Sequence, residues 1–549
     1  MFSDRRLERR TFLRAAGATG VLAGTGLAST FLAGCGSTGG GGTGKVAAGL
    51  APAATALQPG KSIEGTIFAD IASQLPRGGT LDITLTQSAA TLNILSSTLV
   101  AIQWYADPAH DTLERFDQHG NLVPSLAQKV ELVNPTTYRY TLHEANFHNG
   151  RKVVAQDVVD TVEYVRNPTL GSNRAGTFKG VTVRAIDEGV VEFVLPEPNM
   201  GFRYYLPGLP IVPVETAGQL ADNPIGCGPY RFKEWVKDSH IDYEANREYW
   251  NRDLPRLDKL RLTLRTDRQA ATQAMQAGQT DLLDTVPPAQ IQQFEQLVNA
   301  GKVAGATYTS GWSYIGLNTR KGPLRDPRVR RALALAVDRT SIARVNGGKY
   351  STPVCTAPYP PESPEYPKDL DYSRDLNTAR SLLEQAGASS LKLEILTTNA
   401  ATVAIATVVK SNWKDIGVEA QITQIDVPTW VARRTRGDFE VGLSGWFSSR
   451  EPSYVLDNLF TSNGLSNFWG YQSATADALI KQGRTTFDPN ARRDVYLKLL
   501  KLLFIDEPPL IPLTSDNNFM VFRPGVNGAD IAPTALTLWR YAVAAKRNA

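Results

Sequence analysis

Residues 138–165, YRYTLHEANFHNGRKVVAQDVVDTVEYV, contain the succession of strand, turn and helix that decides the fold. The stretch opens with apolar residues that alternate with polar ones, as in a strand with one buried face: Tyr138, Tyr140 and Leu142. Val130 and Leu132 alternate in the same way just before it, and Asn134-Pro135 marks a turn between the two runs. The sequence therefore predicts an antiparallel hairpin.

A helix follows this hairpin. The Asn149-Gly150 turn leads into a run in which four residues share one helical face: Val158, Thr161, Val162 and Val165. The run ends before Pro168, because proline cannot continue a helix. His143 and His148 lie close together before the helix, but their spacing fits no pair of metal ligands one helical turn apart. We interpret both as polar loop residues and predict no metal site.

Further strands and helices extend outward from this stretch. On the N-terminal side, residues 81–86 alternate as a strand, whereas residues 93–113, which include Trp104, are too irregular for an assignment. On the C-terminal side, residues 257–264 predict a strand, and residues 267–278 predict a helix that ends at a glycine.

A second unit of strands and helices begins after residue 320. Asp326 and Pro327 suit the N-cap and first position of a helix with a buried face, formed by Val329, Ala332, Leu333 and Ala336. Residues 391–395, 401–416 and 418–425 then predict a strand, a helix and a strand. Because this unit would be built separately from the first, we expect an α/β protein of two lobes with a cleft between them.

The composition is that of a large globular chain. The 549 residues are 42% hydrophobic and 20% charged, which is enough apolar material for a sizeable core. The formal net charge is +4, and +3 of it lies in residues 1–34. The remaining charge is too small to favour nucleic acid or an anionic membrane surface as a partner.

The N-terminal stretch predicts the compartment. Arg9-Arg10 opens a weakly apolar run that ends at LAGC, residues 32–35, and this resembles a bacterial twin-arginine signal with a lipobox. A transmembrane helix is the alternative, but glycines interrupt the window and it falls short of about 20 strongly hydrophobic residues. We therefore predict a signal peptide over 1–34, a lipidated Cys35 that anchors the protein outside the cytoplasm, and a flexible tether over 35–77.

The stretch 138–165 and several later segments resemble the bacterial extracellular solute-binding proteins of family 5, the oligopeptide, dipeptide and nickel class. Residues 223–230, NPIGCGPY, are similar to that family's P.GTGPY turn, with Cys227 where threonine is usual. We interpret Gly226 and Gly228 as turn residues whose backbone angles are closed to other residues. Residues 314–345 are similar to the family's lNt...PfdDvrVRqAl segment.

The resemblance implies a two-lobed periplasmic-binding-protein-like fold, type II and cluster C, with an extra inserted domain. The implied boundaries are domain I over 78–115, 223–308 and 514–549, domain II over 116–222, and domain III over 309–513. It also implies a function. The chain would be the monomeric substrate-binding protein of an ABC importer that captures a small solute, a peptide by first expectation, and delivers it to permease subunits without a cofactor.

The segment after Gly445-Trp446 departs from the family pattern. Peptide-binding members commonly read GW.aDy.dP, and their aspartate holds the free amino group of the peptide. This chain reaches Pro452 one residue sooner and lacks that aspartate, so we expect no main anchor for an α-amino group here unless Glu451 substitutes. The candidate cleft residues are Asn93, Trp104, Trp312, Tyr314, Trp446, Phe447, Ser448, Ser449, Arg450 and Glu451.

Motifs of enzymes are missing from the sequence. There is no HExxH and no GxSxG, and the five histidines are scattered, so we predict no catalytic residues. A secreted, lipid-anchored hydrolase is the alternative class. Within the binding proteins, glycosides, opines and metal chelates are the alternatives to peptides.

Two cysteines remain besides Cys35. Cys227 and Cys355 could form a disulfide in the oxidising exterior, and two separately buried thiols are the alternative.

Overall fold

The structure is a computed structural model, and it describes residues 57–64, 77–96, 100–116, 122–172, 174–361, 366–449 and 451–526. The predicted signal peptide, Cys35, most of the predicted tether and Arg450 lie outside these residues. Within the part that is described, none of the helices combines the length and the apolar character needed to span a bilayer.

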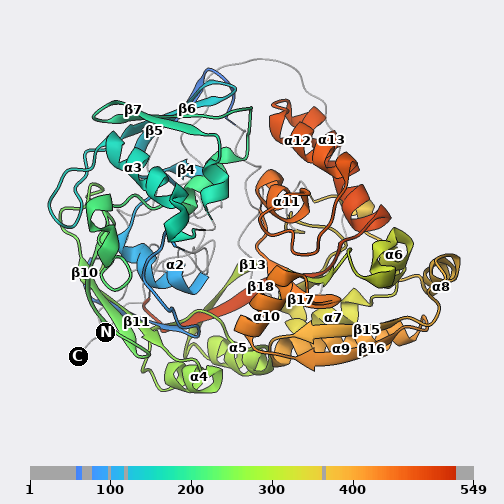
Figure 1. The fold of residues 1–549 in the computed structure, drawn as a ribbon. Coiled ribbons are helices and arrows are strands. Elements are labelled where there is room, and N and C mark those ends of the chain that lie inside the picture. The colour runs from blue at the N-terminus through green and yellow to red at the C-terminus, as the bar shows by residue number, and fades with distance from the viewer. Residues whose placement is uncertain are drawn as a thin grey trace, which may run out of the picture. The chain divides into compact units, whose positions relative to one another are not determined.

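An eleven-stranded sheet joins distant parts of the chain (Figure 1). Its main path runs in the order β16 (Glu419–Gln424), β15 (Lys392–Thr397), β17 (Val441–Trp446), β13 (Ala304–Leu317), β18 (Leu510–Phe522), β12 (Leu282–Leu283), β2 (Thr80–Leu85), β11 (Lys259–Leu264), β10 (His240–Ala245) and β9 (Tyr230–Val236). The short strand β14 (Ser351–Pro353) pairs with β18 off this path. The predicted strands at 81–86 and 257–264 are confirmed as β2 and β11, which pair in parallel.

The two longest described strands, β13 and β18, lie in the middle of this sheet and connect its two parts. β13 pairs with β17 from Trp312 onward and with β18 along most of its length, while the C-terminal end of β18 pairs with β12. The pairing of β13 with β18 is irregular between Thr309 and Gly311. A Cβ atom at Gly311 would lie 2.1 Å from the carbonyl oxygen of Trp446, so only glycine fits at this crossing. We call the part of the sheet from β12 to β9 the N-terminal half, and the part from β16 to β17 the C-terminal half.

A separate five-stranded sheet contains the strands predicted around residues 130–142. Its order is β1 (Lys61–Glu64), β5 (Ala127–Asn134), β6 (Thr137–Leu142), β8 (Val190–Val194) and β7 (Thr182–Asp187). The predicted hairpin is confirmed, because Val130 lies opposite Tyr140 and Leu132 opposite Tyr138. Helix α3 (Ala155–Arg166) covers this sheet with the predicted apolar face, and a short pair, β3 (Glu114–Phe116) and β4 (Leu122–Pro124), lies outside it.

The remaining α-helices pack on one or the other half of the large sheet. The C-terminal half carries α6 (Pro327–Leu335), α7 (Arg339–Asn346), α8 (Leu376–Gln385), α9 (Ala400–Lys414), α10 (Val427–Arg436), α11 (Pro452–Phe460), α12 (Ala474–Thr485) and α13 (Pro489–Lys501). The N-terminal half carries α2 (Val100–Ala106), α4 (Arg268–Gln276) and α5 (Ile291–Asn299). The predicted cap is confirmed, because Asp326 accepts a hydrogen bond from the backbone N–H of Arg328 at 2.8 Å. The unit β15–α9–β16, with parallel strands, is confirmed as well.

Two expectations about residues 223–230 and the cysteines are wrong. Gly226 and Gly228 do not adopt positive φ angles; instead, added Cβ atoms would lie 2.3 and 2.5 Å from backbone atoms of Ala109. These glycines are needed because another segment of backbone packs against the turn. The disulfide is not formed, since Cys227 and Cys355 are both free and buried.

The sulfur atoms of the two cysteines lie in different parts of the fold. The Sγ of Cys227 lies 4.0 Å from the carbonyl oxygen of Ile211 in the core of the N-terminal half, and that of Cys355 lies 3.4 Å from the carbonyl oxygen of Tyr372. Burial raises the pKa of the Cys227 thiol well above its usual range, so this thiol stays protonated.

Candidate functional site

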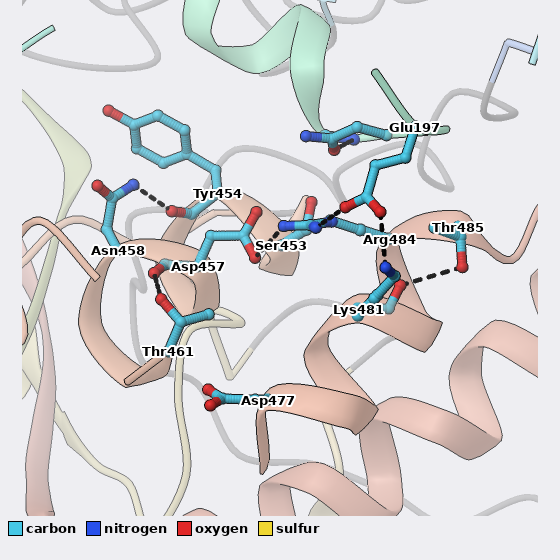
Figure 2. A network of polar contacts seen from close by, with 12 residues as sticks. Glu197, Ser453, Tyr454, Asp457, Asn458, Thr461, Asp477, Lys481, Arg484 and Thr485 are labelled. Atoms are coloured by element: carbon cyan, nitrogen blue, oxygen red, sulfur yellow. Dashed lines mark hydrogen bonds and ion pairs between the residues drawn. The ribbon is translucent and has the colours of Figure 1, made fainter. Parts of the chain in front are cut away.

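Residues that follow the five-stranded sheet contact two helices of the C-terminal half (Figure 2). Glu197, which follows β8, pairs with Arg484 of α12 across 287 positions of sequence and accepts a hydrogen bond from Lys481 at 2.7 Å. The backbone N–H of Met200 donates to the carbonyl oxygen of Arg484 at 3.0 Å. Arg484 also lies 3.5 Å from Asp457 of α11. We call these contacts the 197–484 contact.

The two carboxylates of this contact differ in environment. Hydrogen bonding from Lys481 and the charge of Arg484 lower the pKa of Glu197, despite partial burial. Burial instead raises the pKa of Asp457 to about 6, and Arg484 opposes this shift only in part. The contact therefore depends on Glu197 as its firmly ionised partner.

Aromatic side chains form a row beside this contact. Trp446 stacks on Phe447 with ring centroids 5.5 Å apart, and Phe447 lies 5.3 Å from Tyr454 of α11. Tyr454 in turn lies 4.5 Å from Tyr205, which belongs to a short 3-10 helix, η5 (Phe202–Gly208), after the five-stranded sheet. The Phe447 side chain is 43% exposed, so this aromatic row offers apolar area at the surface.

Two polar atoms near the row have no partner among the described residues. They are the indole N–H of Trp446 and the hydroxyl of Ser448, and both are buried. Buried polar groups are normally hydrogen-bonded, so each is suited to a group that enters from outside the chain. Burial lowers the pKa of Arg174, whose charge interacts with Tyr454, to about 10.

The structure places the other predicted residues of the C-terminal half more deeply. Trp312 lies opposite Trp446 in the pairing of β13 with β17, and it is buried. Tyr314 is buried too and packs edge-on against Trp469, in the core of this half. Trp312 is therefore a buried cross-strand neighbour of Trp446, and both Trp312 and Tyr314 belong to the core of this half.

Glu451 and Ser449 have structural partners. Glu451 caps α11 by accepting from the backbone N–H of Ser453 at 3.1 Å, and it accepts from Arg492 through both carboxylate oxygens, one of them at 2.9 Å. The hydroxyl of Ser449 donates to the carbonyl oxygen of Glu451 at 2.8 Å. In this structure Glu451 is therefore not available to hold an amino group. Pro452 at the first position of the helix is the sequence signal that indicates a cap here.

Asn93 and Trp104 lie apart from the aromatic row. Asn93 accepts from the backbone N–H of Leu95 at 3.1 Å and so stabilises its own turn. Trp104, on α2, belongs to the core of the N-terminal half, whereas Trp446 packs against the core of the other half. The indole N–H of Trp104 is buried and has no partner among the described residues.

Asp284, the residue after β12, carries no sequence signal that marks it as a site residue. It is buried, and one of its carboxylate oxygens has no hydrogen-bond partner among the described residues. Burial raises its pKa to about 7, although Arg268 and hydrogen bonds from Thr285 act in the opposite direction. Only the assembled sheet buries this residue, so no local pattern marks it.

One group of three residues in the described part of the chain has the spacing of metal ligands. Glu234, His240 and Asp242 lie on β9 and β10, with ligand atoms within 4.8 Å of one another. Both oxygens of Asp242 already accept from Arg261, one of them at 2.6 Å, so an arginine occupies the place of a cation. The loop histidines have other roles: His143 stacks on Trp250, and the ring of His148 hydrogen bonds with the carbonyl oxygen of Gly228.

Comparison with known proteins gives a consistent result. The family described as bacterial extracellular solute-binding proteins, family 5 middle, matches residues 121–467. The oligopeptide-binding protein AppA of Bacillus subtilis is 26% identical over 505 residues, which cover 83% of this chain and 90% of that protein.

Solved structures agree on the fold. The periplasmic binding protein DppA of Helicobacter pylori, in complex with the peptide STSA, superposes with a TM-score of 0.78 at 21% identity, covering 87% of this chain and all of the other. The binding protein AgaA of A. tumefaciens R10, in complex with agropinic acid, gives a TM-score of 0.77 at 21% identity, covering 86% and 99%. The predicted fold, that of the two-lobed periplasmic binding proteins, is confirmed.

Proposed function

This chain belongs to family 5 of the bacterial extracellular solute-binding proteins, and from that premise we propose that it is the substrate-binding protein of an ABC importer. It captures a peptide outside the cytoplasm and delivers it, as a monomer, to the permease. A peptide cargo is supported by the relative AppA, whose name describes an oligopeptide-binding protein, and by the aromatic row, which offers apolar area to side chains of varied shape.

The observation that carries this proposal is the 197–484 contact. It joins the region after the five-stranded sheet to α12 through ion pairs and a backbone hydrogen bond, and Arg484 in turn lies 3.5 Å from Asp457 of α11. A ligand that touches both regions stabilises the arrangement in which they meet, because only that arrangement contacts it from two sides. Tyr205 and Tyr454 come from the two regions and meet beside the contact. We propose that Trp446, Phe447 and Ser448 contact the ligand there.

The ligand is not held mainly through an α-amino group bound by the segment from Trp446 to Pro452. That segment lacks the aspartate of the peptide-binding pattern, and Glu451 is engaged by Arg492. Opines, glycosides and metal chelates are the alternative cargoes, because members of this fold bind ligands as different as a peptide and agropinic acid.

Native mass spectrometry of the protein purified from its own host tests the function. We expect a folded species that carries one small solute, and release of that solute under denaturing conditions should identify a peptide. Protein that carries no solute, and that also binds nothing from a defined tripeptide mixture in calorimetry, would contradict the proposal.

We also propose that Cys35 is lipidated and that the twin-arginine signal directs export. The support is the sequence of residues 9–35, in which small residues precede the cysteine. Cys35→Ala should release the protein from the membrane fraction, because the lipid would be its only anchor. If the variant stays as firmly bound as the parent, the N-terminal segment is a transmembrane helix and the anchor is wrong.

A further inference from the structure

Asp284 lies where open α/β sheets commonly bind ligands. It directly follows β12, which pairs in parallel with β2, so the carboxyl ends of both strands meet at this edge. Ligands of such sheets bind outside the carboxyl ends of the parallel strands. β12 also pairs with β18, one of the two long strands shared by both halves. Asp284 therefore lies at the carboxyl end of β12, next to the long strands β13 and β18 that connect the two halves of the sheet.

The side chain of Asp284 is 2% exposed, and its charge has no ionic partner within the described residues. Its oxygen Oδ1 accepts no hydrogen bond in that part of the chain, and no lysine or arginine described there forms an ion pair with it. Arg268 acts on it only from a distance, and Thr285 hydrogen bonds with the carboxyl group. In such surroundings a carboxyl group either holds a proton, in keeping with its raised pKa, or, when ionised, needs a cation beside it to balance the cost of its burial.

Two tyrosine hydroxyls interact with Asp284, and they differ in whether they already have hydrogen-bond partners. The hydroxyl of Tyr308 is occupied, because it donates to the backbone oxygen of Asp284 at 3.3 Å and accepts from Asn518 at 2.8 Å. The hydroxyl of Tyr105 is close enough for the charge of Asp284 to affect its pKa, yet it has no partner among the described residues and is buried. Asp284 and Tyr105 thus present one unused acceptor oxygen each.

We propose that Asp284, assisted by the hydroxyl of Tyr105, binds an ammonium group of the transported solute. This deepens the proposed function and rests on it. The anchor for positive charge then lies in the N-terminal half, whereas the peptide-binding pattern places its aspartate after the tryptophan of the C-terminal half. An ammonium group has donors for both unused oxygens.

A pair of small probes tests this site without knowledge of the cargo. n-Butylammonium chloride and n-butanol have the same chain but differ in charge. Thermal unfolding at pH 8 of wild-type protein, Asp284→Asn and Asp369→Asn is recorded with each probe. Asp369 is an exposed carboxylate for which the described residues offer no ion pair or hydrogen bond, so it serves as the matched control.

We expect n-butylammonium, and not n-butanol, to raise the melting temperature of the wild type and of Asp369→Asn, and Asp284→Asn to lose this effect. The isosteric amide removes a poorly solvated charge, so the variant should fold, and circular dichroism checks that it does. Tyr105→Phe should show a smaller loss, which gives a second variant. An equal response of wild type and Asp284→Asn, or no response of the wild type, would overturn the proposal.

Calorimetry with peptides separates this inference from the function itself and identifies the source of the ammonium group. The probes are Ala-Ala-Ala, its N-acetylated form and N-acetyl-Ala-Lys-Ala. Asp284→Asn should weaken binding of whichever peptide carries the preferred ammonium group by about ten- to a hundred-fold, the usual range for a hydrogen bond to a charged group. If n-butylammonium binds through Asp284 but no peptide binds, the peptide cargo is wrong and the ammonium site stands. If peptides bind equally to wild type and variant, the function stands and the ammonium site is wrong.

Discussion

Replacing Arg492 with methionine should destabilise the C-terminal half, because it leaves Glu451 as a buried charge without a partner. The side chains of Arg492 and Glu451 are 12% and 6% exposed. Burial alone would lower the pKa of Arg492, but the charge of Glu451 raises it above its usual range. Arg492 also donates to the hydroxyl of Tyr496 at 3.1 Å and to the carbonyl oxygen of Gly483 at 2.8 Å.

The burial of this ion pair sets the expected loss in the free energy of unfolding. Removing one member of a buried ion pair costs about 3–5 kcal/mol, whereas removing both leaves no isolated charge and costs less. We therefore expect Arg492→Met to lower the free energy of unfolding by about 3–5 kcal/mol and the double variant Glu451→Gln/Arg492→Met by clearly less than the sum of the single changes.

Urea unfolding followed by tryptophan fluorescence measures these differences. Arg493→Met is the matched control, because Arg493 is exposed and the described residues give it no ion pair; it should change stability by no more than about 0.5 kcal/mol. If Arg492→Met unfolds like the control, the ion pair does not stabilise the fold. If Glu451→Gln abolishes peptide binding at unchanged stability, Glu451 holds the ligand and the structural role is wrong.

Three further predictions follow from other contacts. Burial raises the folded pKa of Asp284 from 3.8 to about 7, so between these pH values the folded protein holds a proton that the unfolded chain has lost. The free energy of unfolding should therefore fall as pH rises from about 4 to about 7. Urea titrations should show that Asp284→Asn lacks this fall, and the same pH dependence in wild type and variant would contradict the prediction. Thiol titration of Cys35→Ala, unfolded without reductant, should detect both Cys227 and Cys355, and no reaction would restore the disulfide. Glu197→Gln breaks partly exposed ion pairs that contribute up to about 1 kcal/mol. Calorimetry should therefore show ligand binding weakened by no more than about five-fold. A hundred-fold loss would mean that Glu197 touches the ligand.

The sequence predicted those elements whose signal is local. The alternation around Val130 and Tyr140 and the helical face of α3 identify themselves, as does the cap at Asp326. The sheet order was not accessible in this way. β2 lies between β11 and β12, and β18 between β12 and β13, so the sheet unites strands from the beginning, middle and end of the described chain. Tertiary packing decides such pairings, and no local pattern encodes them.

The same distinction applies to the candidate site. The sequence identifies Trp446 and Phe447 because they stand next to a recognisable motif, but it does not reveal that Phe447 packs against Tyr454 of α11. The sequence leaves the role of Glu451 open, because Arg492, its partner, lies 41 positions away. Gly226 and Gly228 were identified correctly as constrained positions, but the cause is the approach of the Ala109 backbone, which only the fold reveals.

Hydrogen–deuterium exchange with and without Ala-Lys-Ala tests the central claim, capture of a solute between two regions, most directly. We expect the peptide to slow exchange in two segments at once: the 3-10 helix η5 at Phe202–Gly208 and helix α11 at Pro452–Phe460, which supply Tyr205 and Tyr454. Protection confined to one of these segments, with the other exchanging as in the free protein, would contradict binding between the two regions.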